Sequence, residues 1–439
     1  MPEIIPLLVC LEPYLSSTSL RQLHHVVFAM LCVPKRATML GLSRWSEKGG
    51  SYRTIQRLYH TPLNWLEIHW VFLKTHLLTS DKFYLLAGDE VVEAKSGKKT
   101  HGVGRFYSGL AQRVIPSVSV LALSLVDVES RQSYPLSVQQ IMPKVQSAPE
   151  PLPTIKKGRG RPKGSKNYAK PDPIPSPLLE LLGRMITAIH SQLAYLQVKH
   201  IVLDGNFGNY PSTWVVRQTD LHIISKMKRN AALYLPYDGP KPKRGPTPRY
   251  GDKLNYQQLP QLARVASSVE DDYQIDTYQL QLYHKDYPDL LNVVVVVKTH
   301  LPTGKRGHIV LFSTDPELTA QQIVDYYSLR FKIEFNFRDT KQHWGLDDFM
   351  TIKPQAVTNS INLAFFMVNF SHVMLEPYRL HDPDFSVLDL KAQFRARRYL
   401  DETIKMLPKT PEPYLISRIW RRLACFGSIR SPQSHDFAA

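Results

Sequence analysis

The sequence predicts an α/β fold in which a strand-rich core lies between helical regions. Three observations predict it. Apolar residues recur at helical spacing in the first 80 residues, strand-like runs replace them from Lys82, and helical spacing returns near residue 316. The expected order through the first half of the core is β-β-β-α-β-α-β. With 439 residues, 43% of them hydrophobic, the chain can bury such a core.

Residues 1–80 are expected to form a helical DNA-binding region. Its helices are predicted at residues 20–31, 37–42, 52–59 and 65–77. The third of these begins after Ser51, a good capping residue, and carries Arg53 and Arg57, which suits a helix that lies against DNA. An ordinary solvated helix face explains the same residues, and the sequence leaves both interpretations open.

Residues 81–142 are expected to form the first part of the core as three consecutive strands. The first is the short apolar run Phe83–Ala87, the second covers residues 114–126, and the third covers residues 133–141. A strand exit at Gly88-Asp89 follows the first run.

Residues 143–177 are rich in Pro, Gly, Ser and Lys and are expected to form a basic linker outside the packed core. The run Arg159-Gly160-Arg161-Pro162 in this linker resembles an AT-hook. A narrow minor groove attracts inserted arginines, and Gly and Pro keep the backbone slim. A flexible basic linker that binds phosphates without sequence preference is the alternative.

The rest of the chain is expected to alternate again between strands and helices. A helix over residues 178–196 and strands at 200–203 and 221–224 would complete the core. A long helix should begin at a capping box of Thr319 and Gln322 and end near Gly345. The boundaries are expected at 178–228 for the second part of the core, 229–315 for a β-rich insertion, 316–350 for the core helix, and 351–439 for a helical, basic C-terminal region.

Bulk composition narrows the classes of partner. The formal charge of +17 and the pI near 9.6 indicate a polyanion. No apolar run reaches the roughly 20 residues of a membrane-spanning helix, and Met1-Pro2-Glu3 lacks the basic start of a secretory signal. Three distant cysteines without a C-x-x-C pair support neither a disulfide framework nor a zinc ribbon. Nucleic acid and an anionic membrane surface both fit this charge, and the lack of a spanning run weakens the membrane interpretation. The protein is expected to stay in the cytoplasm.

Two aspartates are candidates for chemistry because of their position. Asp89 and Asp204 are each expected to end an apolar strand beside a glycine, Gly88 or Gly205. An acid at a strand end faces the open edge of a sheet, where ligands bind, and a glycine lets other groups come close. Each one taken alone is also a common turn residue.

A third acid lies on the long helix. Tyr327, Arg330, Glu334, Arg338 and Lys341 fall on one face at about 100° per residue. A glutamate among cations suits a site in which the acid binds metal and its neighbours grip DNA phosphates. A salt-bridged surface stripe is the alternative. Three carboxylates suit phosphodiester cleavage by two Mg²⁺ ions about 3.5 to 4 Å apart, because that chemistry uses hard oxygen ligands.

The spacing Tyr327-x2-Arg330-x3-Glu334-x6-Lys341 resembles the Y-(2)-R-(3)-E-(6)-K signature of bacterial insertion-sequence transposases with a DDE catalytic core. The surroundings resemble that group as well, so that the likeness covers roughly residues 83–350. The segments that carry it are Leu85–Asp89, Gly97–Val103 and Ile201–Phe207.

The resemblance implies an RNase H-like catalytic core with a β-rich insertion between the second Asp and the Glu. It implies that Asp89, Asp204 and Glu334 are catalytic and bind two Mg²⁺ or Mn²⁺ ions. Asp89 is followed by Glu90-Val91, where relatives more often have Asp-Thr, so that Glu90 is an alternative ligand. The expected position at a strand end favours Asp89.

The same resemblance implies that Tyr327, Arg330 and Lys341 contact DNA phosphates. The expected function is cut-and-paste transposition: hydrolysis at terminal inverted repeats, then strand transfer into target DNA. A homodimer on two DNA ends is expected, in a bacterial cytoplasm and on the nucleoid when DNA is bound. The alternatives are a non-catalytic or domesticated DNA-binding protein and an RNase H-like nuclease without strand transfer.

Overall fold

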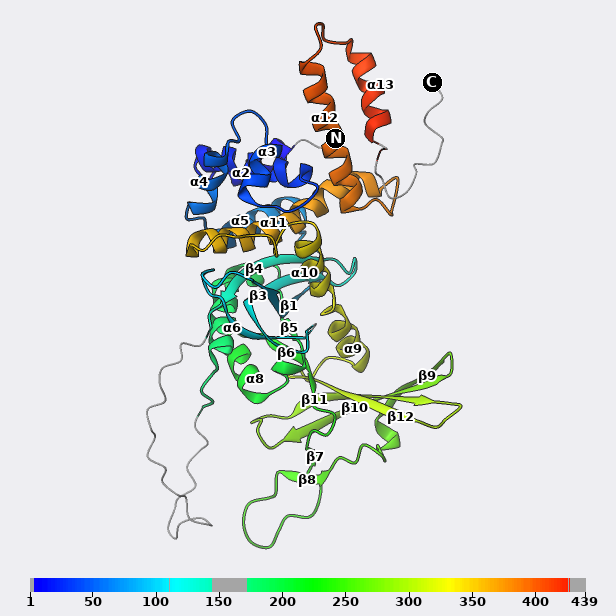
Figure 1. The fold of residues 1–439 in the computed structure, drawn as a ribbon. Helices are drawn as coiled ribbons and strands as arrows, with labels where there is room; N and C mark the ends of the chain where they lie inside the picture. The colour runs from blue at the N-terminus through cyan, green and yellow to red at the C-terminus, as the bar shows by residue number, and fades with distance from the viewer. Residues whose placement is uncertain (1–3, 110, 144–171, 425, 427–439) are drawn as a thin grey trace, which may run out of the picture.

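The computed structural model of the chain describes residues 4–109, 111–143, 172–424 and 426. Its architecture is mixed α/β, with one large mixed sheet and helices on both sides of its central strands (Figure 1). Helices from the two ends of the chain lie together at one end of the molecule, and a strand-rich region lies at the other (Figure 1). None of the helices in the described ranges has both the length and the apolar character needed to cross a membrane.

The N-terminal region is helical, as predicted. The side chains of Ser16, Thr38, Ser51 and Asn64 each cap a helix by accepting a backbone N–H, which explains where four of these helices begin. The elements are α1 (Ile4–Leu8), η1 (Val9–Leu11), α2 (Ser17–Cys32), α3 (Met39–Trp45), α4 (Tyr52–His60) and α5 (Trp65–His76).

Six strands form the central part of the sheet. They are β1 (Tyr84–Ala94), β2 (Gly104–Ser108), β3 (Arg113–Asp127), β4 (Ser133–Ile141), β5 (His200–Leu203) and β6 (His222–Met227). β3 lies between β1 on one side and both β2 and β4 on the other, and all of these pairs are antiparallel. β1, β5 and β6 pair in parallel. The order through the centre is therefore β4-β3-β1-β5-β6.

The prediction of three consecutive strands at the start of the core was wrong, because the structure has four. The additional strand is β2, a five-residue strand paired with the first residues of β3. Only Ser108 of β2 is buried, and its neighbours Arg105 and Tyr107 are exposed. Phe106 is the one apolar side chain of β2 that packs against the core, and a single such residue gives no apolar alternation in the sequence.

Helices cover both faces of these central strands. One face is covered by α6 (Pro177–Ala188), α7 (His190–Tyr195), η2 (Gly205–Phe207) and α8 (Tyr210–Arg217). Ser176 caps α6 and Pro177 is its first residue, as predicted. The single helix expected over residues 178–196 is in fact two helices, separated at Ile189, which is fully buried and has non-helical backbone angles. The apolar spacing continues through the break between α6 and α7 because both helices bury their apolar face in the same core, so the sequence pattern looked like one helix.

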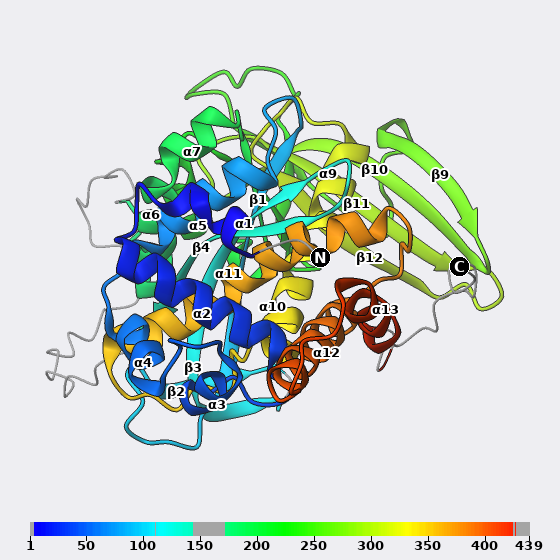
Figure 2. The same cartoon turned by 90° about the horizontal axis from the view of Figure 1, so that it is seen from above.

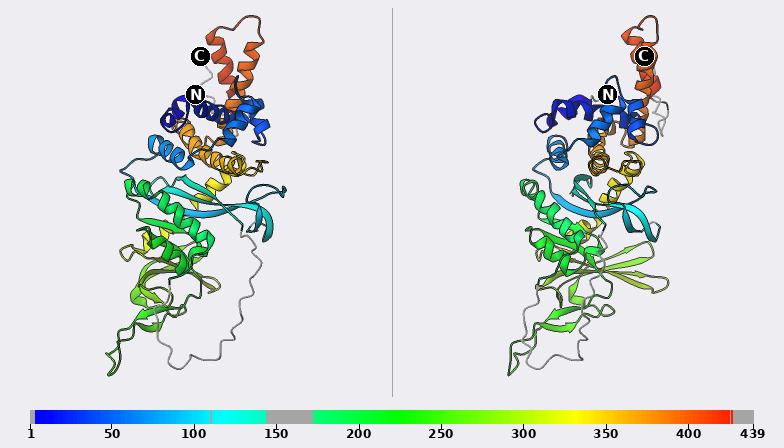
Figure 3. Two further views of the ribbon diagram at one scale, coloured as in Figure 1. Left: turned by 90° about the vertical axis from the view of Figure 1, so that its left-hand side faces the viewer. Right: turned by 60° about the vertical axis from the view of Figure 1, so that its left-hand side comes forward.

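Beyond β6 the sheet continues into six further strands, β7 to β12. These elements are β7 (Leu233–Pro236), β8 (Tyr250–Lys253), η3 (Gln261–Ala263), β9 (Arg264–Glu270), β10 (Tyr273–His284), β11 (Leu291–His300) and β12 (Arg306–Ser313). β12 pairs antiparallel with β6, with Phe312 opposite Ser225. The β-rich segment thus extends the same sheet, and its long hairpins project away from the helical end (Figures 1 and 3).

The long helix predicted from Thr319 to Gly345 is two helices, α9 (Ala320–Leu329) and α10 (Lys332–Gln342). The predicted capping box of Thr319 and Gln322 is present. Continuity fails at Arg330 and Phe331, where backbone hydrogen bonds reach back three residues, as from Glu334 N–H to the Phe331 carbonyl. Helical spacing alone does not reveal such a break, since both halves keep their apolar faces on the sheet.

The C-terminal helices are α11 (Pro354–Arg379), α12 (Val387–Lys405) and α13 (Pro413–Ala424). α11 lies between the N-terminal helices and the sheet (Figure 2). Its Asn359 donates to the backbone carbonyls of Leu58, Tyr59 and Thr61 and accepts from the indole N–H of Trp65 at 2.8 Å. These bonds fix the N-terminal helices to α11, although the bonded residues are 298 to 300 positions apart in the sequence.

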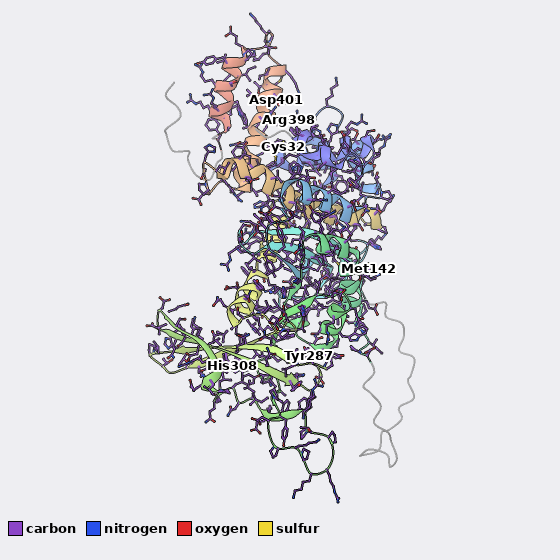
Figure 4. The ribbon with its side chains drawn as sticks, turned by 180° about the vertical axis from the view of Figure 1, so that it is seen from behind. Cys32, Met142, Tyr287, His308, Arg398 and Asp401 are labelled. Carbon is purple, nitrogen blue, oxygen red and sulfur yellow. The ribbon has the colours of Figure 1, made fainter. Side chains whose placement is uncertain are left out.

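α12 is joined to the N-terminal helices in a similar way. Arg398 donates to the backbone carbonyl of Ser46 at 3.2 Å, and the thiol of Cys32 lies 3.7 Å from the Phe394 carbonyl oxygen. Figure 4 shows Arg398 and Cys32 close to each other at this junction. The N-terminal helices therefore pack against both α11 and α12, and α13 packs against α12 on the side away from the sheet (Figure 1).

Candidate catalytic site

Asp89 lies on β1, and Asp204 directly follows β5, the strand that pairs with β1 in parallel. In the pairing of β1 with β5, Gly88 is opposite Leu203, which is the last residue of β5. Asp89 directly follows Gly88, and Asp204 directly follows Leu203. The two aspartates therefore lie together where the parallel pairing of β1 with β5 ends. The carboxyl edge of parallel strands is the usual ligand-binding position in α/β sheets.

The prediction that Asp89 ends its strand was wrong, although Asp204 does follow the end of β5. β1 continues to Ala94 because β3 keeps pairing with its other side, with Asp89 opposite Ala122 and Ala94 opposite Ser117. Asp89 is nevertheless the residue at which β1 loses β5 as a neighbour. Its side chain is 17% exposed, which gives a ligand access to it.

Gly88 allows the two strands to pack closely. A Cβ atom on Gly88 would lie 2.8 Å from the Cδ2 of Leu203 and 3.0 Å from the Cδ2 of Leu123. Both leucines belong to the core on the sheet face opposite the acids. The glycine next to Asp89 therefore serves the packing behind the site.

Asp204 begins the tight loop that follows β5. Its Oδ1 accepts the backbone N–H of Asn206 at 3.0 Å, and its carbonyl accepts the Ser225 hydroxyl at 2.7 Å. The loop packs closely on β6, since a Cβ on Gly208 would lie 2.0 Å from the Lys226 carbonyl oxygen. These contacts hold the backbone of Asp204 and leave one of its carboxylate oxygens available.

Arg330 connects the first and third acids. One guanidinium nitrogen, Nη1, donates to Asp89 Oδ2 at 2.6 Å, and the other, Nη2, donates to Glu334 Oε1 at 3.0 Å. Glu334 lies in the first turn of α10, so the break between α9 and α10 places Arg330 between strand and helix. The two carboxylates are thus separated by no more than one guanidinium group.

The electrostatics of Asp89 reflect this crowding. Burial raises the pKa of Asp89 to about 6, and the charges of Asp204 and Glu334 act in the same direction. The Arg330 guanidinium and the backbone N–H of Glu90 oppose that rise in pKa. Repulsion between carboxylates shifts a pKa only when the groups are close together. The effect of Asp204 and Glu334 on the pKa of Asp89 therefore indicates that the three acids lie near one another.

Tyr327 lies on the α9 side of the same region. Burial raises the pKa of its phenol, Arg330 lowers that pKa, and the charges of Asp204 and Asp89 raise it. The structure therefore brings together Asp89, Asp204, Tyr327, Arg330 and Glu334. In the expected stripe, Arg338 differs from the others: it donates to Asp339 and lies over the Phe335 ring, and half of its side chain is exposed.

Lys341 also faces β1, but at a different residue. It forms an ion pair with Glu93, which lies four residues beyond Asp89 on the same strand. Residues four apart on a strand share a face, so Glu93 and Asp89 point to the same side of the sheet. Sequence reasoning missed Glu93, although the even spacing from Asp89 was a signal that could have found it.

Glu90, the alternative ligand, points to the opposite face. Successive side chains on a strand alternate, and the Glu90 carboxylate accepts the Ser119 hydroxyl on β3. Of these two acids, Asp89 is the one paired with Arg330, and Arg330 in turn pairs with Glu334. The geometry favours Asp89.

Further cations lie at the same edge of the sheet. Lys226, Lys228 and Arg229 are exposed where β6 ends, next to the loop that Asp204 begins. Three basic residues within four positions at a strand exit were a signal in the sequence that could have identified them. The minor-groove arm Arg159–Pro162 lies outside the described residues.

The donor set suits a hard divalent cation, since three carboxylates offer only oxygen. Among the residues that the structure describes, no group of three or more His, Cys, Asp or Glu side chains is close enough to hold a metal ion. The Arg330 guanidinium stands between Asp89 and Glu334.

A family model described as DDE superfamily endonuclease matches residues 10–285, which is more than half of the chain. The match includes Asp89 and Asp204 and ends before Glu334. No curated protein matches the chain. Taken with two aspartates side by side at the end of a parallel strand pair, the match shows that this chain belongs to the DDE superfamily of endonucleases.

Proposed function

We propose that the protein is a cut-and-paste transposase of an insertion sequence, of the branch with the Tyr-Arg-Glu-Lys signature. The observation that carries the proposal is the meeting of Asp89, Arg330 and Glu334, with Asp204 on the adjacent strand. Glu334 lies outside the family match, yet it reaches the same edge of the sheet as the two aspartates within it. The signature cations Arg330 and Lys341 both pair with acids of β1, Asp89 and Glu93 respectively.

The sheet topology supports an RNase H-like core. Three antiparallel strands, β4, β3 and β1, are followed by β5 and β6, which run parallel to β1, with α6 and α7 between β4 and β5. This is the order expected for such a core, with β2 as an addition. The strands β7 to β12 are inserted between Asp204 and Glu334 and extend the sheet beyond β6.

Asp89, Asp204 and Glu334 would hold two Mg²⁺ or Mn²⁺ ions. Bound ions of this kind lower the pKa of water, polarise the scissile phosphate and stabilise the leaving oxygen. Asp89 and Glu334 need a counter-charge in any state, because they are close and partly buried. Arg330 supplies it in the DNA-free protein and would turn to a DNA phosphate when other positive charge compensates Asp89.

The reaction has two phosphoryl-transfer steps. In the first, water attacks a phosphodiester at the transposon end, the bond to the 3′ oxygen breaks, and that oxygen leaves as a 3′-hydroxyl. In the second, this hydroxyl attacks a target phosphodiester, forming one strand junction and releasing one target 3′-hydroxyl. Tyr327, Arg330 and Lys341 would fix the phosphates for in-line attack, which is the main contribution a protein makes to phosphoryl transfer.

The DNA partners are the terminal inverted repeats of the element and the target duplex, and two ends require a homodimer in the synaptic complex. The formal charge of +17 supports binding to both duplexes. The N-terminal helices and the basic segment around Arg159 and Arg161 are proposed to add DNA contacts, in a bacterial cytoplasm and on its nucleoid.

The experiment uses purified protein, Mg²⁺ and a duplex carrying the inverted repeat that flanks the coding region. Asp204→Ala and Asp89→Asn are expected to bind this duplex and release no cleaved product, a loss of at least about a thousandfold in rate. Glu90→Gln is the matched control on the same strand and should cleave like the natural chain. Full cleavage by Asp204→Ala rejects the assignment of the site.

Two further outcomes separate the alternatives. Precut ends incubated with supercoiled plasmid should yield joined products. A protein that cuts but never joins is a nuclease without strand transfer. A protein that binds the ends and neither cuts nor joins them is a non-catalytic DNA-binding protein.

A further inference from the structure

Two ion-paired contacts connect β1 to α10. The first is the Asp89–Arg330–Glu334 cluster, and the second is the pair of Glu93 with Lys341. Asp89 and Glu93 are four residues apart on an extended strand, about 13 Å. Glu334 and Lys341 are two helical turns apart, about 10 Å. Strand and helix therefore run alongside each other, and the acids of one match the charged groups of the other.

Glu93 is a charged residue whose side chain is almost fully buried. Its side chain is only 9% exposed, whereas the Lys341 side chain is 37% exposed. Buried carboxylates are costly unless they are paired. Lysine has three N–H donors and the Glu93 pair uses one of them, so the exposed side of the Lys341 ammonium keeps donors for another anion.

The fold does not depend on this pair alone. Lys95, the first residue after β1, donates to the backbone carbonyls of Asp347 at 2.8 Å and Phe349 at 3.3 Å. Its ammonium also lies 3.5 Å from the centre of the Phe349 ring. These contacts hold the segment after α10 to the end of β1. Loss of the Glu93 carboxylate is therefore compatible with a folded protein.

We propose that Glu93 is a positioning residue that holds the Lys341 ammonium at a fixed distance along β1 from Asp89, ready to bind one phosphate of the DNA end. The inference rests on the proposed function and adds a residue to it. Without Glu93, Lys341 would keep its charge but lose its fixed place, and a loosely held contact contributes little to in-line attack.

A competing role gives opposite results. If Glu93 merely neutralised Lys341 until DNA displaced it, removing the carboxylate would strengthen DNA binding. If Glu93 positions Lys341, removing it costs the phosphate contact. The two roles differ in the salt dependence of binding, because each phosphate contact contributes about 0.9 to the slope of log affinity against log salt.

The binding experiment is done in EDTA, with the inverted-repeat duplex and full-length protein, so that metal loading has no effect. Lys341→Ala and Glu93→Ala are each expected to lower the slope by about 0.9. Glu90→Ala, which removes a carboxylate from the opposite face of the same strand, should leave the slope unchanged. Tighter binding by Glu93→Ala, or a slope equal to that of the Glu90→Ala control, overturns the proposal.

The kinetic experiment uses single turnovers with Mg²⁺ at saturating DNA. Glu93→Ala is expected to cleave about tenfold more slowly. Glu93→Gln, which keeps an acceptor oxygen for Lys341, should recover part of that loss. The double variant Glu93→Ala/Lys341→Ala should be no slower than Lys341→Ala within about twofold, because both substitutions remove one contact.

Outcomes for the two proposals are distinct. Additive losses in the double variant, or a Glu93→Ala protein as fast as the natural chain, overturn the role of Glu93 while the proposed function stands. A natural chain that cleaves no inverted-repeat DNA overturns both. Melting temperatures of all variants within a few degrees of the natural chain establish that the losses are not due to unfolding.

Discussion

Asp89 and Glu90 are adjacent on β1, and the alternation of the strand sends their carboxylates to opposite faces of the sheet. Asp89 pairs with Arg330 at the break between α9 and α10, whereas Glu90 accepts a hydrogen bond from Ser119 of β3. The neighbours of each residue come from distant parts of the sequence. Chemical type alone made these two acids equivalent candidates, and their environments separate them.

At the residue scale, His69 predicts a pH dependence of stability. His69 is fully buried on α5, and burial lowers its pKa to about 4. The unfolded chain, in which His69 has an ordinary pKa of about 6.5, binds the proton more readily. The contribution of neutral His69 to stability is therefore complete above about pH 6.5 and is lost as pH falls toward 4.

His69→Phe is expected to remove this part of the pH dependence. Between pH 7.5 and 4.5, the natural chain should lose about 2 to 3 kcal/mol more of its free energy of unfolding than the variant. Urea unfolding at several pH values measures the difference. Asn369, which donates to His69 at 3.2 Å, keeps its bond to the Pro135 carbonyl at 2.7 Å in the variant. Parallel pH curves for the two proteins would contradict the assignment.

At the scale of elements, short-range signals determine where helices start, and long-range packing determines where they stop. The capping residues Ser51, Ser176 and Thr319 each precede a helix in the expected place. The ends of α6 and α9 were not visible in the sequence. Both ends fall inside apolar repeats that continue into the next helix, and only the sheet beneath them sets the change of direction.

The capping box at Thr319 has a measurable energy. The Thr319 hydroxyl accepts the Gln322 N–H at 3.3 Å, and the Gln322 side chain accepts the Thr319 N–H at 3.0 Å. Thr319→Ala is expected to lower the free energy of unfolding by about 1 kcal/mol, and Thr319→Ser by much less. Urea unfolding of the two variants tests this. A Thr319→Ala variant as stable as the natural chain would mean that the capping box contributes nothing to α9.

At the scale of the whole molecule, one continuous sheet joins the central strands to the β-rich extension. The connection is the pairing of β6 with β12, and its core includes Phe312, which is fully buried and contacts the Tyr287 ring edge-on. At the other end, α11 carries Phe366 and Phe370 against Phe72 of the N-terminal helices. Both ends of the chain and the extension are thus bound to the same set of strands.

Phe312→Ala tests the importance of the connection between β6 and β12. Loss of a fully buried phenylalanine is expected to cost about 3 to 5 kcal/mol. Ile309→Ala, three residues earlier on the same strand and 38% exposed, is the matched control and should cost less than about 1.5 kcal/mol. Urea unfolding of both variants gives the comparison. Similar losses would show that the junction is not a tightly packed core.

The sequence by itself determined most of the local structure: the helical ends, the strands β1, β3, β4, β5 and β6, and the residue types able to perform phosphoryl transfer. Periodicity and capping are properties of neighbouring residues, so they are visible without a fold. Only the tertiary structure decided that Asp89 lies inside a strand, that Arg330 stands between Asp89 and Glu334, and that Glu93 holds Lys341. Those facts depend on parallel strand pairing and on the contact of β1 with Arg330, which is 241 residues after Asp89, and no local pattern encodes either.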